Sequence, residues 1–155
     1  SLPAVVEEPD NIAARGGMQV GACLAGIAFL KGLGLVHAIS HMVGAEYDTH
    51  HGLTNAVVLP AVLRFNAPAI AEKVPAMMRA LDQPGTDFDA FYRYVCGLLD
   101  QFQIPRTLSE LGVPESAAEA LTIKALKDAA AGTNPRVADA DSLMTVISEA
   151  ITVGR

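Results

Sequence analysis

Residues 34–60 read GLVHAISHMVGAEYDTHHGLTNAVVLP and contain all four histidines of this 155-residue chain. The histidines are His37, His41, His50 and His51, so they lie within fifteen consecutive positions. Neutral imidazole is the commonest metal ligand in proteins and the side chain that most readily moves protons near neutral pH. We therefore expect the chemistry of the protein to be located in this stretch.

His37 and His41 are four residues apart, which on a helix places both imidazoles on one face, one turn apart. This spacing can hold a metal at two points, but it is not specific by itself. The zinc-protease motif requires glutamate directly after the first histidine, where this chain has Ala38. That chemistry is therefore not supported.

His51 follows His37 by fourteen residues, which on one straight helix would separate the two by about 21 Å. Two nitrogens that share a metal must lie within roughly 4 Å of each other, because each bond is near 2 Å. A shared site therefore requires the chain to reverse near residues 47–49, and a helix that continues through Asp48 would exclude it. His50 and His51 are neighbours, so they should not both face one ion, and spacing does not decide between them.

Outward from this run, most of the chain shows apolar residues at helical spacing, and no segment alternates cleanly with a period of two. The sequence therefore predicts an all-α helical bundle, formed as a single domain over residues 1–155. The first expected helices run from Asp10 or Asn11 to Leu30, over 35–47, over 52–65 with a kink at Pro60, and over 69–81 with an internal Pro75. The later ones run from a Thr86 cap to Pro105 and over 114–131. A last helix begins at an Asp139 or Asp141 cap and carries Leu143, Val146, Ile147, Ala150 and Ile151 on one face.

Two apolar patterns predict core packing. The most apolar stretch runs from Met18 to Leu30 and is too short to span a bilayer, so we interpret it as a helix buried by its neighbours, with a membrane segment as the alternative. The second pattern is a stripe at helical spacing: Phe88, Phe91, Tyr92, Val95, Leu98, Leu99 and Phe102.

Composition excludes several function classes. Hydrophobic residues make up 51% of the chain and charged residues 18%, which permits a large core and argues against disorder. The net charge of −6, without a basic patch, argues against nucleic-acid binding. Cys23 and Cys96 are too few for a disulfide scaffold, and no signal peptide is visible. We therefore expect a cytoplasmic protein with reduced thiols and no membrane partner.

The histidine run resembles the C-terminal helical domain of the iron-containing (group III) alcohol dehydrogenases. The likeness covers nearly the whole chain, and the fourteen-residue histidine interval matches together with the HG-x-x-NA ending. The matching residues are 25–29 (AGIAF), 34–41 (GLVHAISH), 44–45 (GA), 51–56 (HGLTNA), 59–60 (LP), 64–66 (RFN) and 133–136 (TNPR).

The resemblance implies a divalent metal, usually Fe(II), in a cleft between an N-terminal nucleotide-binding domain and this helical domain. One aspartate and three histidines hold the metal in the family, and His37 and His51 match two of those histidines. His41 matches the family histidine beside the nicotinamide and substrate, which implies a cofactor-binding and catalytic role in proton transfer. His50 stands where the family often has proline and receives no role.

The implied reaction interconverts a small alcohol with an aldehyde or ketone by hydride transfer to or from NAD or NADP. A metal lowers the pKa of the alcohol, and Zn(II) is an alternative to Fe(II) because histidine and carboxylate ligands suit both. In the family, the other two ligands and the nucleotide-binding domain lie upstream of the matched region. We therefore expect a fragment that is inactive alone, exposes a helix face and self-associates. Homo-oligomers are common in the family.

Other interpretations stay open at this point. A standalone helical metal-binding or interaction domain would use His37, His41 and His51 as a closed three-histidine site with supporting hydrogen-bond partners. A metal-independent reductase of the same superfamily is disfavoured because His37 and His51 are both present. The plainest interpretation places His37 and His41 in the core and His50 and His51 in a surface loop.

Overall fold

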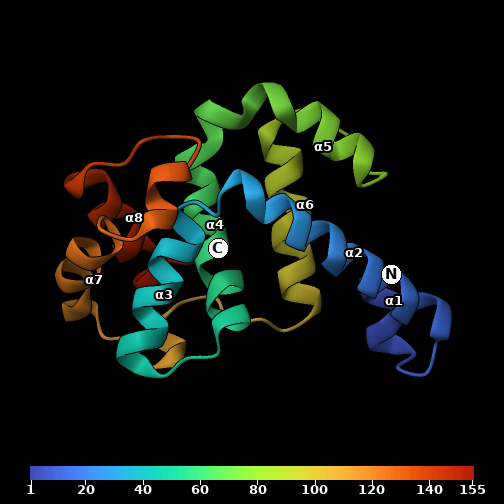
Figure 1. The fold of residues 1–155 in the computed structure, drawn as a ribbon, viewed down its shortest axis with the longest axis horizontal. Helices are drawn as coiled ribbons and strands as arrows, with labels where there is room; N and C mark the ends of the chain where they lie inside the picture. The colour runs from blue at the N-terminus through green and yellow to red at the C-terminus, as the bar shows by residue number, and fades with distance from the viewer. The chain divides into compact units, whose positions relative to one another are not determined.

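The computed structural model describes residues 1–155, and all of its regular structure is helical (Figure 1). The all-α prediction is therefore confirmed. The elements are α1 (Leu2–Glu7), α2 (Ile12–Ala28), η1 (Phe29–Lys31), α3 (Leu35–Tyr47), α4 (His51–Ile70), η2 (Ala71–Lys73), α5 (Val74–Ala80), α6 (Phe88–Gln101), η3 (Ser109–Leu111), η4 (Glu115–Ala117), α7 (Ala118–Ala125), η5 (Ala129–Thr133) and α8 (Ala140–Thr152), where η marks a 3-10 helix. Two compact units, Ser1–Gly32 and Leu33–Arg155, are described separately below.

The first unit contains α1, α2 and η1. The Asn11 side chain caps α2 by accepting the Ala14 N–H at 2.9 Å, as helix-capping chemistry favours. The expectation that this helix is buried is wrong in the structure, because Ala14 is the one buried residue of α2. Val20, Leu24 and Ile27 are 61%, 61% and 60% exposed, since the short neighbours α1 and η1 do not cover them.

The core of the second unit is formed by α3, α4, α7 and α8, each of which packs against two of the others. Ile39, Val58, Leu121 and Ile147, one from each helix, are fully buried there. Burying an aliphatic side chain of this size stabilises the fold by about 1.5–3 kcal/mol. This four-helix core fixes the positions of α3 and α4, which carry the histidines.

By length and composition alone, Ile12–Lys31 and His51–Ala80 could cross a membrane. Helices from the cores of soluble proteins have the same length and apolar composition. Of the most apolar 18 residues in His51–Ala80, 44% are buried inside the structure.

The third predicted helix extends past its predicted end, and neither Pro60 nor Pro68 ends it. Pro60 and Pro68 both lie inside α4, which continues to Ile70 instead of ending near residue 65. The α-helix is interrupted at η2, after Ile70. Pro75 then occupies the first turn of α5, where a missing N–H costs little. Pro60 is itself buried, so tertiary packing offsets the backbone hydrogen bond that proline removes.

Helix α6 differs from its prediction in its burial and at both ends, since it stops at Gln101 and not at Pro105. Asp87, not Thr86, caps the helix by accepting the Ala90 N–H at 2.7 Å. The apolar stripe predicted as core is only half-buried, and no residue of α6 is fully buried. The reason is that α6 packs mainly against α4 and α5, outside the four-helix core.

The predicted helix over 114–131 is interrupted. Only Ala118–Ala125 is α-helical, and η4 and η5 flank it. Asp128 caps η5 by accepting the Ala130 N–H at 2.8 Å, so local capping replaces helix continuation. For the last helix, Asp139 and not Asp141 is the cap, and with Ser142 it forms a capping box.

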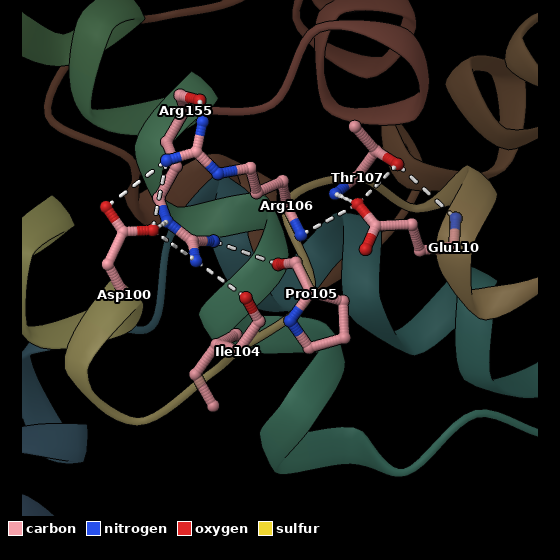
Figure 2. Close-up of polar contacts among 7 residues, drawn as sticks. All are labelled: Asp100, Ile104, Pro105, Arg106, Thr107, Glu110 and Arg155. Carbon is pink, nitrogen blue, oxygen red and sulfur yellow. Dashed lines mark hydrogen bonds and ion pairs between the residues drawn. The ribbon is translucent and has the colours of Figure 1, made fainter.

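The C-terminal Arg155 ties the chain end to α6 (Figure 2). Its side chain is 2% exposed and lies 3.0 Å from the Asp100 carboxylate. It also donates to the carbonyls of Ile104 at 2.6 Å and Pro105 at 2.9 Å. Arg106 bonds the same carboxylate at 3.1 Å, so two guanidinium groups hold the end of α6 against the end of the chain.

Candidate functional site

The chain reverses direction between α3 and α4. Helix α3 ends at Tyr47, Asp48 adopts the left-handed conformation with φ 52°, and α4 begins at His51. No helix continues through Asp48, so the condition that would have excluded a shared histidine site is not met. The two helices pack directly against each other, which brings residues fourteen apart in sequence close together.

Three imidazoles meet at this junction. The ring centroids of His37 and His51 are 5.2 Å apart, those of His41 and His51 are 5.5 Å apart, and those of His37 and His41 are 5.8 Å apart. His50 has a different task, because its Nδ1 accepts the Leu53 N–H at 3.2 Å and caps α4. Of the two neighbouring histidines, His51 therefore joins the cluster and His50 caps the helix.

The Nε2 atoms of His37 and His51 converge on one point. The side-chain nitrogen of Asn55 lies 3.3 Å from Nε2 of His37 and 3.1 Å from Nε2 of His51. The amide oxygen of Asn55 is buried and has no hydrogen-bond partner, which is rare for a buried polar atom. Both Nε2 atoms therefore direct a lone pair toward the same Asn55 NH₂ group. Two imidazole lone pairs that point to one place can also bind a divalent metal there.

Ser40 supports the orientation of His51. Its hydroxyl is buried, lies 3.5 Å from His51 Nδ1 and donates to the His37 carbonyl at 3.3 Å. An imidazole that donates its Nδ1–H keeps the lone pair on Nε2 for another partner. The contact therefore favours the His51 tautomer that a metal ligand requires.

The pKa of His37 is lowered from its ordinary value. Burial is the largest cause, the neighbouring His51 and His41 add to it, and the Asp128 carboxylate opposes it. His37 consequently stays neutral at lower pH than an ordinary histidine. A neutral ring is the form that binds metals.

His41 is held by a residue from another part of the chain. Its Nδ1 lies 3.0 Å from Oδ2 of Asp128, while Oδ1 of Asp128 accepts the Ala130 N–H. Burial raises the pKa of Asp128, but the hydrogen bonds from Ala130 and His41 outweigh it and the net pKa is lowered. Sequence reasoning missed Asp128 because the predicted helix over 114–131 gave it no special position.

No group of three His, Cys, Asp or Glu side chains within residues 1–155 is arranged to hold a metal ion. His37 and His51 converge through Nε2, whereas His41 turns Nδ1 toward a carboxylate. The closed three-histidine site of the standalone interpretation is therefore not found in this chain.

Asn66, Thr133 and Asn134, which belong to the other stretches that resemble the family, stabilise the start of α3. The Asn134 side chain accepts the Leu35 N–H at 3.1 Å and exchanges two amide hydrogen bonds with Asn66. Thr133 accepts the Leu33 N–H at 3.2 Å. Gly34, at the start of α3, has no side chain that could cap the helix. Asn134 and Thr133 therefore accept backbone N–H groups that would otherwise lack a partner. They fix the helix just before its first histidine.

Comparison with known proteins identifies the family. Residues 1–151 match the model of the Fe-containing alcohol dehydrogenase family, C-terminal. The chain is 34% identical to the probable alcohol dehydrogenase EutG of Escherichia coli (strain K12), over 97% of this chain and 38% of that protein. It is 35% identical to the NAD-dependent methanol dehydrogenase of Bacillus methanolicus, over 97% of this chain and 41% of that protein.

The fold agrees with this match. A crystal structure of 1,3-propanediol oxidoreductase superposes with a TM-score of 0.89 and 32% identity, over 95% of this chain and 40% of that one. This all-helical chain therefore belongs to the iron-containing alcohol dehydrogenases and corresponds to their C-terminal region, as the resemblance predicted. It spans about 40% of the length of the relatives it matches.

Proposed function

We propose that the chain provides the C-terminal, metal-binding part of an NAD(P)-linked alcohol dehydrogenase, which interconverts a small alcohol with an aldehyde or ketone. The observation that carries this proposal is the convergence of the Nε2 atoms of His37 and His51 beside Asn55. Family membership supports the reaction class, and the two converging imidazoles support a metal site between α3 and α4.

In this proposal His37 and His51 hold a divalent metal, Fe(II) or Zn(II), through Nε2. The metal, when bound, polarises the alcohol oxygen and lowers its pKa. Two histidines do not complete a metal site, so we propose that further ligands come from the part of the longer relatives that precedes the matched region. The same part is proposed to bind most of the NAD or NADP.

His41 is proposed to be the catalytic residue that carries the hydroxyl proton and to lie beside the nicotinamide. Its side chain is 37% exposed, so its ring can exchange a proton with solvent. Its Nδ1 is engaged by Asp128, which leaves Nε2 for the substrate. Proton transfer through a positioned histidine is a common contribution to catalysis.

The chain is similar to a methanol dehydrogenase, to a 1-propanol dehydrogenase of Citrobacter freundii and to a 1,3-propanediol dehydrogenase of Klebsiella pneumoniae. We therefore propose a small alcohol or aldehyde as substrate. A cytoplasmic homo-oligomer without nucleic-acid or membrane partners is part of the same proposal.

The test is a chimera in which residues 1–155 replace the matched part of the Klebsiella pneumoniae 1,3-propanediol dehydrogenase. The chimera is loaded with Fe(II) without oxygen, and reduced nicotinamide is followed by absorbance with a panel of small alcohols. We expect alcohol-dependent reduction that falls on the order of a hundredfold or more in H51A, because a ligand is lost. A folded, metal-loaded chimera that oxidises no alcohol would contradict the proposal.

A further inference from the structure

We propose that Asp128 is the positioning residue of His41, and that its carboxylate fixes His41 in the tautomer with the proton on Nδ1. Only one part, that Nε2 of His41 accepts the substrate proton, rests on the proposed function. The tautomer and its cause are properties of the chain itself.

Asp128 contacts the His41 ring through one carboxylate oxygen. Oδ2 of Asp128 lies 3.0 Å from Nδ1 of His41. An ionised carboxylate has acceptors only, and the pKa of Asp128 is lowered. The nitrogen that faces the carboxylate must therefore carry the proton, because an unprotonated Nδ1 would set two lone pairs against each other.

The Asp128 carboxylate is itself held in place. Its other oxygen accepts the Ala130 N–H at 2.8 Å as the cap of η5. The carbonyl of Asp128 accepts the Ala131 N–H at 3.0 Å, and the side chain is only 15% exposed. Because both the carboxylate and the backbone carbonyl of Asp128 are hydrogen-bonded, the carboxylate can set the orientation of the His41 ring.

The ring of His41 also packs against the two other imidazoles of the cluster. It stacks on His51 with an interplanar angle of 16° and meets His37 edge to face at 69°. With Nδ1 committed to Asp128, Nε2 is the one ring nitrogen left for another group. A ring with a free Nε2 lone pair accepts a hydroxyl proton without first exchanging its own.

The test reads the tautomer directly in the metal-free 155-residue chain. Two-bond nitrogen–proton correlation spectra distinguish a protonated from an unprotonated ring nitrogen, and H41Q identifies the His41 signals. The spectra are recorded with a chelator at mildly alkaline pH, where an ordinary imidazole is neutral. We expect His41 to carry its proton on Nδ1.

Asp128→Asn is the informative variant. Asparagine caps helices as well as aspartate does, so its oxygen can keep the Ala130 N–H and its NH₂ then faces His41. A donor in that position reverses the preference, and we expect the ratio of the two tautomers to change by about tenfold or more toward Nε2–H. Asp139→Asn, the same substitution at the cap of α8, should leave the His41 spectrum unchanged.

A wild-type His41 protonated on Nε2 would overturn the proposal, and so would a folded Asp128→Asn chain with an unchanged tautomer. If Asp128→Asn does not fold, the wild-type spectrum still decides, and Asp128→Glu, which keeps a carboxylate, should retain the Nδ1 proton. An inactive chimera would count against the proposed function and leave the tautomer result standing. An active chimera whose kcat is unchanged by Asp128→Asn would overturn the catalytic use of the positioning.

Discussion

His37 and His51 lie on different helices, yet their ring centroids are only 5.2 Å apart and the Nε2 atom of each faces the same amide nitrogen. The left-handed Asp48 between α3 and α4 makes this possible, because it ends one helix three residues before the next begins. The site is therefore a property of the helix junction, and it depends on the four-helix core that holds both helices in place.

Asn55→Asp should strengthen metal binding. The Asn55 amide now lies between the two Nε2 atoms, and a carboxylate there would add a third ligand of the kind that Zn(II) accepts. We expect the Zn(II) affinity of the chain, measured by competition with a chromophoric chelator, to rise at least about tenfold. The gain should disappear in the double variant Asn55→Asp, His51→Ala. An unchanged affinity in Asn55→Asp would show that the amide does not mark the ion's position.

His50→Ala should affect stability and not metal binding. His50 caps α4 through the Leu53 N–H, and loss of a cap typically costs about 0.5–2 kcal/mol. Urea unfolding should show a loss of that size, and His50→Asn, which supplies another capping group, should recover most of it. A metal affinity that falls in His50→Ala as far as in His51→Ala would argue against this division of roles.

The all-α fold and the helix end near Asp48 were predicted from the sequence, and helical spacing placed His37 and His41 on one face. The approach of His51 was stated only as a condition, which the chain reversal at Asp48 meets. The role of His50 was not predicted, since histidine is not among the preferred capping residues. Asp128 was also missed, because capping and its contact with His41 override the helical propensity of its surroundings. Such long-range contacts leave no periodic trace in the sequence.

The burial of α2 was also not predictable from its sequence. Its composition is typical of a buried helix, but burial requires neighbours, and sequence pattern does not say whether they are present. The half-buried stripe of α6 is a milder case. In both helices the helix itself was predicted correctly and its environment was not.

The α2 surface should cause self-association. Val20, Leu24 and Ile27 recur at helical spacing and are each about 60% exposed, and apolar surface of this kind favours association. Sedimentation velocity should show concentration-dependent dimers or larger species. The double variant Leu24→Glu, Ile27→Glu should shift the distribution to monomer without loss of helical circular dichroism. Equal distributions for both chains would locate the contact elsewhere.

Asp100 should make stability depend on acid pH. The hydrogen bond from Arg106 is the largest cause that lowers its pKa below the ordinary 3.8, with Arg155 acting in the same direction. A carboxyl with a lowered folded-state pKa stabilises the fold above its unfolded pKa and loses this contribution as the pH falls through the folded value. Wild type should therefore be more stable than Asp100→Asn at neutral pH, and the difference should shrink below about pH 4. A difference that stays constant with pH would contradict this origin.

We propose that His37 and His51, and not His41, are the metal ligands that this chain contributes. The most direct measurement is anaerobic titration of the metal-free chain with Fe(II) and with Zn(II), alongside His37→Ala, His41→Ala and His51→Ala. We expect weak binding of at most one ion per chain, which is lost in His37→Ala and His51→Ala and retained in His41→Ala. Tight one-to-one binding that His41→Ala abolishes, or binding that survives in His51→Ala, would contradict this proposal.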